Sequence, residues 1–159
     1  MKSQFLILFA ALLTLTVSCN KDDDNAANPL ENANNKYTFQ GNTIAITGAE
    51  YYYADGDTYL YFKGTGVSDY VYFTFADIDG AIPTGAFTFH ADRYSGYIPG
   101  SNFWGASVLN EEVPLGIHTT GGSIIITSQP DGAYKITFTF VTPSGDVVGE
   151  YNGFLLPRP

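Results

Sequence analysis

Cysteine occurs only once in the 159 residues, at Cys19. A single cysteine excludes an internal disulfide, so the folded part of the chain must be stabilised by its core. Charged residues are also scarce at 14%, and 7 basic against 16 acidic residues give a formal net charge of −9. Nucleic-acid affinity depends on basic groups that neutralise phosphates and release counterions. We therefore expect no nucleic-acid partner.

Residues for catalysis or metal binding are few. Only His90 and His118 are available as general bases or nitrogen ligands, and the chain has no G-x-S-x-G sequence. His90 and Asp92 form an H-x-D pair to which His118 would add a third ligand, but histidines at strand ends are common. Asp55-Gly56-Asp57 and Asp77–Gly80 resemble calcium loops, yet they lack the closing glutamate and fit turns better. We predict no enzyme, no metal and no cofactor, with a small hydrolase as the weakest alternative.

Long apolar runs are absent except from Phe5 to Val17, which is followed by Ser18 and Cys19. This run is shorter than the roughly 20 residues that a membrane-spanning helix needs. It has the length of the apolar part of a secretory signal. Together with the cysteine it resembles the lipobox of bacterial lipoproteins, with Thr16 at the usual leucine position. The resemblance implies a signal peptide at residues 1–18 and a Cys19 that carries diacylglyceryl and acyl chains, including palmitate.

A polar segment at residues 19–35 follows the cysteine, and its composition predicts a flexible tether. Its beginning, Lys21-Asp22-Asp23-Asp24, resembles the export tag of some surface lipoproteins. That resemblance favours display on the outer face of the outer membrane over the periplasmic face. The remaining residues, 36–159, have the length of one domain.

Alternation of apolar and polar residues recurs throughout residues 36–159, and no long stretch has helical periodicity. The domain is therefore predicted to be all-β. A hairpin loop at 142–145 pairs Phe138 with Gly149 on an apolar face, where glycine leaves room for the ring. A three-residue loop at 130–132 then brings Ile124 to the same face opposite Phe138.

Earlier strands are predicted from similar patterns. Asp55-Gly56 is a hairpin turn that joins Glu50–Ala54 to Asp57–Phe62. Further strands are expected at Tyr70–Ala76 and Ala86–His90, and a short one at Phe103–Leu109.

Four segments together carry a family resemblance: IPTGAFTF (Ile82–Phe89), GSIII (Gly122–Ile126), YKITF (Tyr134–Phe138) and G-x-x-x-G-x-Y-x-G (Gly145 to Gly153). They resemble segments of small uncharacterised outer-membrane lipoproteins of bacteria. The resemblance implies one antiparallel β-sandwich or calycin-like barrel of about 8–9 strands after the lipidated tether. Because these segments contain turns and glycines, they imply no catalytic residue.

Two groups of side chains are candidates for ligand binding. Alternation places five tyrosines on one face of neighbouring strands, where their rings and hydroxyls would suit sugars or a protein partner: Tyr52, Tyr59, Tyr61, Tyr70 and Tyr72. The irregular segment 91–122 offers a second group that combines a guanidinium able to bind an anion with aromatic rings for stacking: Arg93, Tyr94, Tyr97 and Trp104. The alternatives are that a second sheet or this segment covers the tyrosines, and that Phe103 and Trp104 pack into the core.

The sequence therefore predicts a lipid-anchored outer-membrane protein whose β-domain binds a glycan or an envelope protein without catalysis. A structural or assembly subunit of an outer-membrane complex, with its aromatic face buried against another protein, is the alternative.

Lipidation at Cys19 is directly testable. We expect mass spectrometry of the native protein to find an N-terminal Cys19 carrying a diacylglyceryl group and an amide-linked acyl chain. The Cys19→Ser variant should lose both groups and partition into the soluble fraction, because acyl chains supply the membrane affinity. An unmodified cysteine, or an N-terminus elsewhere, would contradict the predicted location.

Overall fold

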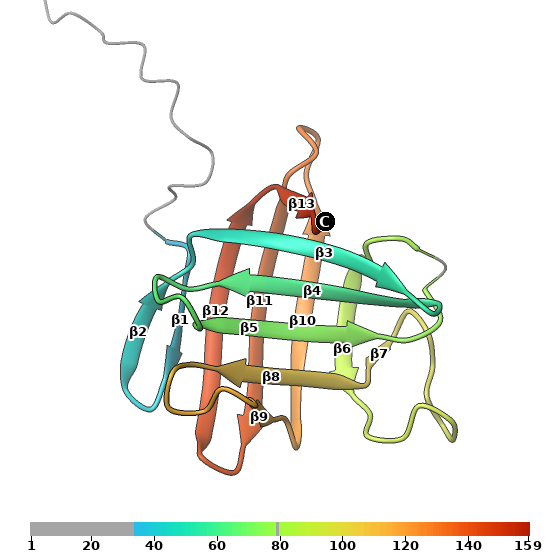
Figure 1. Cartoon of the computed structure of the whole chain (residues 1–159). Coiled ribbons are helices and arrows are strands. Elements are labelled where there is room, and N and C mark those ends of the chain that lie inside the picture. Colours follow the sequence, from blue (N-terminus) through green and yellow to red (C-terminus); the bar gives the residue numbers. More distant parts are fainter. Residues whose placement is uncertain (1–33, 79) are drawn as a thin grey trace, which may run out of the picture.

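The computed structural model describes residues 34–78 and 80–159, which form two β-sheets packed face to face (Figure 1). The strands are β1 (Lys36–Phe39), β2 (Asn42–Ala45), β3 (Gly48–Ala54), β4 (Asp57–Lys63), β5 (Tyr70–Phe75), β6 (Gly85–Phe89), β7 (Asn102–Phe103), β8 (Gly105–Leu109), β9 (Ile117–His118), β10 (Gly121–Ser128), β11 (Tyr134–Thr142), β12 (Gly145–Gly153) and β13 (Leu155–Pro157). None of the described residues forms a helix of the length and apolarity needed to cross a membrane. The predicted signal peptide, Cys19 and tether up to residue 33 lie outside the described residues.

The all-β sandwich is confirmed, and the barrel alternative is not. The seven-stranded sheet has the order β2-β1-β12-β11-β10-β6-β7, and the six-stranded sheet has the order β13-β3-β4-β5-β8-β9. Each sheet keeps two free edges within the described chain, so neither closes on itself. In Figure 1 the strands of one sheet run across those of the other.

The described chain contains thirteen strands, more than the predicted 8–9, and two pairs are parallel: β6 with β7, and β13 with β3. The additional strands are short, with two to four residues in β2, β7, β9 and β13. Segments of this length cannot show a readable alternation. Their pairing depends on tertiary contacts, which local sequence does not encode.

The predicted C-terminal registers are confirmed. Phe138 pairs with Gly149, and Ile124 pairs with Phe138. The loop at 130–132 is closed by a hydrogen bond from Gln129 N to Ala133 O. The other loop is shorter than expected, because Thr142 pairs with Gly145.

The expected strand Phe103–Leu109 is confirmed at Gly105–Leu109, which is β8, but Phe103 and Trp104 do not belong to it, because the chain changes sheets at Trp104. Asn102 pairs with Thr88 in the seven-stranded sheet, whereas Gly105 pairs with Thr74 in the six-stranded sheet. Phe103 has no exposed surface and packs between the sheets. The segment therefore closes one end of the sandwich.

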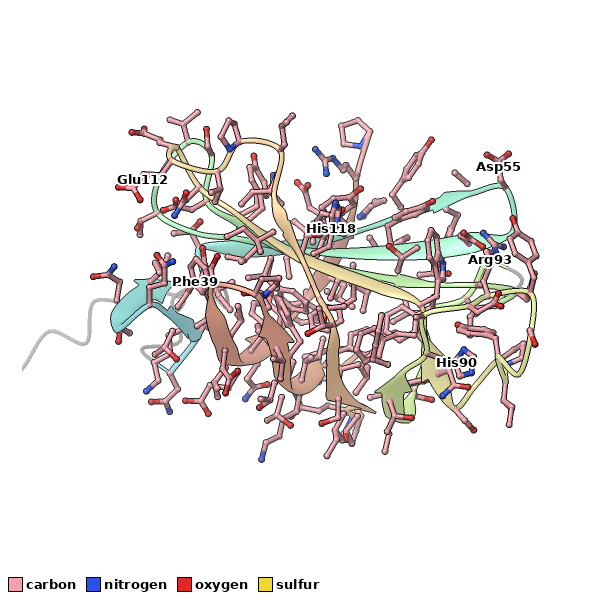
Figure 2. The ribbon with its side chains drawn as sticks, turned by 90° about the horizontal axis from the view of Figure 1, so that it is seen from below. Phe39, Asp55, His90, Arg93, Glu112 and His118 are labelled. Carbon is pink, nitrogen blue, oxygen red and sulfur yellow. The ribbon has the colours of Figure 1, made fainter. Side chains whose placement is uncertain are left out.

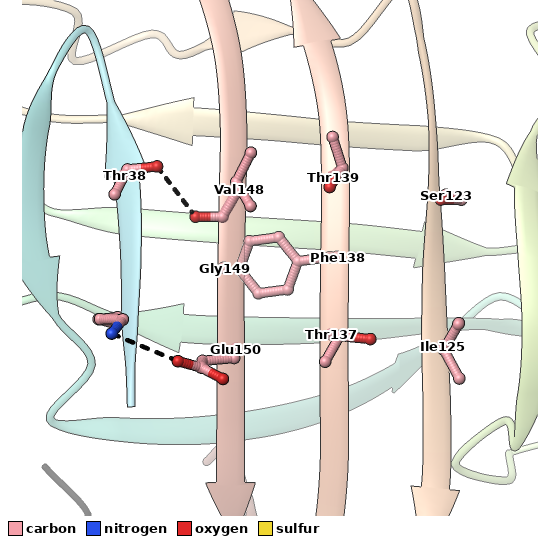
Figure 3. A pocket seen from close by; sticks show the side chains of 10 residues that line it. Thr38, Ser123, Ile125, Thr137, Phe138, Thr139, Val148, Gly149 and Glu150 are labelled. Atoms are coloured by element: carbon pink, nitrogen blue, oxygen red, sulfur yellow. Dashed lines mark hydrogen bonds and ion pairs between the residues drawn. The ribbon is translucent and has the colours of Figure 1, made fainter. Parts of the chain in front are cut away.

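Phe138 lies at the centre of the core. Its ring centroid is 5.3 Å from that of Phe62 and 5.2 Å from that of Phe73, so it joins the two sheets. Figure 3 shows the Phe138 ring lying across Gly149 of the neighbouring strand. A Cβ atom on Gly149 would be 2.2 Å from Phe138 Cζ. Glycine at 149 is therefore a requirement of the core.

We expect the Gly149→Ala variant to lose about 1–3 kcal/mol of the free energy of unfolding, because the new methyl group overlaps the Phe138 ring. Chemical denaturation measures this change. Gly121→Ala is the matched control in the same sheet, since a Cβ there meets no atom within 4 Å. Equal stability of the two variants would show that the Phe138 ring is not held over Gly149.

Candidate ligand-binding face

The five predicted tyrosines lie on the outer face of the six-stranded sheet. Tyr52 is on β3, Tyr59 and Tyr61 are on β4, and Tyr70 and Tyr72 are on β5. In Figure 1 the six-stranded sheet is in front, and no described element passes before β3, β4 or β5. The second sheet and the segment 91–122 therefore do not cover these tyrosines.

Four of these rings form a continuous series. The centroid distances are 6.1 Å from Tyr52 to Tyr59, 6.5 Å from Tyr59 to Tyr61 and 5.7 Å from Tyr61 to Tyr72. We call these four residues the tyrosine row. Tyr70 shares their face and pairs with Lys63.

The tyrosine row is only partly exposed. Tyr52 is 44% exposed, and the other three rings are half-buried among their neighbours. Burial raises the pKa values of the Tyr59 and Tyr61 hydroxyls, so both stay uncharged at neutral pH. Each hydroxyl can both donate and accept a hydrogen bond.

Three charged side chains adjoin Tyr61. Glu50, its partner across β3 and β4, forms an ion pair with Lys63 and lies 3.9 Å from Arg158 Nε. The Arg158 guanidinium carbon also lies 4.2 Å from the Tyr61 ring centroid, a cation–π contact. Two cations therefore share one carboxylate at this position.

Ser107 and His118 extend the face beyond Tyr72. The sheet register aligns Tyr72 with Ser107 on β8 and Ser107 with His118 on β9. Ser107 Oγ lies 2.6 Å from His118 Nδ1. Sequence reasoning did not find this pair, because it depends on the register of the two-residue strand β9.

The Ser107–His118 pair lacks the features of a hydrolytic centre. Ser107 has no exposed surface, so its hydroxyl cannot reach a substrate. Within the described chain no carboxylate is hydrogen-bonded to His118. A nucleophilic serine requires access to the substrate and a base that is itself oriented. The imidazole, in contrast, is exposed and can contact a ligand.

The second predicted group lies beside the first, at Tyr59. Arg93 donates to both carboxylate oxygens of Asp57, at 2.8 and 2.9 Å. Its guanidinium carbon lies 5.6 Å from the Tyr94 ring centroid and 5.3 Å from that of Trp104. Asp57 lies two residues before Tyr59 on β4, so the two side chains share the outer face of the sheet. The two groups thus meet at one end of the tyrosine row.

Arg93 holds its own loop in this structure. Asp57 is only 3% exposed, and its carboxylate accepts hydrogen bonds from both terminal nitrogens of the Arg93 guanidinium. The guanidinium that the sequence suggested as a binding group for an anion is therefore already paired within the chain. Figure 2 shows Arg93 and Asp55 at the same end of the domain. The Tyr97 hydroxyl has a similar structural role, since it accepts from Ala76 N and donates to Asn102 O.

The histidine sites considered for metal do not assemble. His90 Nδ1 lies 2.9 Å from the backbone oxygen of Asp92, whose carboxylate accepts from Tyr94 N instead. Figure 2 shows His90 and His118 in different parts of the domain. Among residues 34–78 and 80–159, no three His, Cys, Asp or Glu side chains are placed to hold a metal ion.

A shallow groove of about 510 Å³ lies on the outer face of the seven-stranded sheet (Figure 3). The side chains around it are mostly short: Thr38, Ser123, Ile125, Thr137, Thr139 and Val148. At its edge, Lys36 and Glu150 are 3.4 Å apart and neutralise each other. The groove thus offers neither an exposed ring nor an excess of charge, and the tyrosine row is the better candidate despite being flatter.

Comparisons of the chain with protein-family models, with curated proteins and with solved structures find no match. The interpretation of the site therefore depends on its residues and geometry.

We expect the Arg93→Gln variant to lose about 3 kcal/mol of the free energy of unfolding, because the buried Asp57 carboxylate would lose its charged partner. Urea denaturation measures the loss. Lys36→Gln is the control, since its ion pair with Glu150 is exposed and should contribute less than about 1 kcal/mol. Similar small losses in both variants would show that Arg93 does not anchor its loop.

Proposed function

We propose that this chain is a lipid-anchored protein of the outer-membrane surface whose β-domain binds a ligand or partner without catalysis. The binding surface is the tyrosine row together with its polar neighbours. Anchoring through Cys19 and export to the cell surface depend on the sequence resemblances described above.

The observation that carries this proposal is an uncovered series of four tyrosine rings on a rigid sheet. Tyrosine offers flat apolar area and a hydroxyl, and it loses little conformational entropy on binding. Sheet pairing holds the rings in place before a ligand arrives, so less ordering is needed on binding.

Assembly into an outer-membrane complex is the second candidate. The observation that favours it is the pair of exposed apolar side chains in the groove, Ile125 at 50% and Val148 at 47%. In that case the seven-stranded sheet, rather than the tyrosine row, would contact the partner.

A comparison of two double variants tests the proposed function. Tyr59→Ala/Tyr72→Ala removes two rings of the row, and Tyr53→Ala/Tyr94→Ala removes two exposed rings outside it. We expect the row variant to recover about tenfold less glycan or envelope protein than the full chain in a pull-down, because central aromatic residues dominate binding energy. The control should recover as much as the full chain.

Circular dichroism and thermal unfolding of each variant verify that both remain folded. Equal recovery by the full chain and the row variant would contradict a role for the tyrosine row. Loss in the control alone would place binding at the segment around Tyr94.

A further inference from the structure

The charge on the tyrosine face differs from that of the whole chain. Lysine and arginine number only 7 against 16 acidic residues, yet Lys63 and Arg158 both lie beside Tyr61. They share Glu50 as their carboxylate partner. One positive charge at this position is therefore not compensated by Glu50.

Exposure increases this imbalance at the surface. The side chains of Lys63 and Arg158 are 37% and 39% exposed, whereas that of Glu50 is 17% exposed. Solvent or a ligand thus meets the cations before the carboxylate. At the other end of the face, Asp57 is already neutralised by Arg93. The position beside Tyr61 therefore suits an anionic group.

Hydrogen-bonding groups continue from this cationic position across the sheet. The register aligns Glu50, Tyr61, Tyr72, Ser107 and His118 on five successive strands. At about 4.8 Å between strands, this line is roughly 19 Å long. It places cations at one end, rings in the middle and an exposed imidazole at the other end. An extended ligand with an acidic group and several hydroxyls matches that order.

A saccharide fits this surface better than a peptide does. The backbone groups of β3, β4 and β5 are paired within the sheet, so the face has no free ladder for an added peptide strand. Binding must use rings, hydroxyls, the imidazole and the two cations. These groups match the C–H faces, hydroxyls and carboxylates of an acidic sugar.

We propose that the tyrosine row binds an acidic saccharide, with a sugar carboxylate held by Lys63 and Arg158 and sugar rings lying over Tyr59 and Tyr72, the two rings that flank Tyr61. The Tyr61 ring itself is already covered by the Arg158 guanidinium. This inference depends on the proposed function, because it names the ligand class of the same face. In the complex, the sugar carboxylate competes with the Glu50 carboxylate for Lys63 and Arg158.

The test uses the full chain purified in detergent and three acidic polysaccharides: polygalacturonate, alginate and hyaluronan. Each is compared with its carboxyl-reduced form, which keeps the sugar rings and removes the charge. Isothermal titration calorimetry should find at least one polysaccharide that binds about tenfold more tightly in its acidic form. That preference should decrease as salt is added.

Three variants connect the preference to the proposed position. Arg158→Gln and Lys63→Gln should each weaken binding of the acidic form by about threefold, which together accounts for the tenfold preference, and leave the neutral form unchanged. Glu50→Gln should tighten binding of the acidic form several-fold, a gain that misfolding cannot produce. Lys135→Gln, a charge removed from the opposite sheet, should have no effect.

The outcomes separate this inference from the proposed function. Equal affinity for acidic and reduced forms, or no change in Glu50→Gln, would overturn the acidic-saccharide assignment. Equal binding of poly-glutamate would also overturn it, because charge alone would then suffice. If no polysaccharide binds but the pull-down still depends on Tyr59 and Tyr72, the face binds another ligand class and only this inference fails.

Discussion

The register between β4 and β5 controls both the core and the candidate site. Phe62 pairs with Val71 and Leu60 with Phe73, and all four side chains are completely buried. Because side chains alternate along a strand, the same register places Tyr61 opposite Tyr72 on the outer face. A shift of one residue would expose the phenylalanines and bury the tyrosines. The core thus fixes the position of the rings.

The surroundings of the tyrosine row come from distant parts of the chain. Arg158 reaches Tyr61 because β13 pairs with β3 in parallel, and its backbone N donates to Tyr51 O. His118 reaches Ser107 because β9 adds to β8. A surface that combines rings, cations and an imidazole therefore requires both edges of the six-stranded sheet. Loss of either short edge strand would remove polar groups from the site while leaving the rings.

Strand registers and turns are predicted most accurately from the sequence where local turn chemistry and the alternation of apolar and polar residues agree. The registers at Phe138 and Gly149 and the turn at Asp55-Gly56 follow from those two rules and are confirmed. Alternation also placed the tyrosines on one face, as observed. The crossing between sheets at Trp104 was missed, because Phe103–Leu109 looks like one uninterrupted strand.

The charged and polar side chains around the site were harder to predict from the sequence than the positions of the tyrosine rings. Arg93 looked available for an anion, but the buried Asp57 binds it, and nothing local to either residue indicates that pairing. Conversely, Lys63, Arg158 and His118 gave no sequence indication of a shared surface. Their proximity is a consequence of strand order, which a single sequence with short edge strands does not determine.

Nuclear magnetic resonance of the chain with ¹³C-labelled tyrosine rings, titrated with an acidic polysaccharide, tests the central claim most directly. The account predicts that the ring resonances of Tyr52, Tyr59, Tyr61 and Tyr72 shift together, while those of the buried Tyr37 and Tyr151 stay unchanged. Shifts confined to Tyr94 and Tyr97, or no shift at any tyrosine, would contradict it.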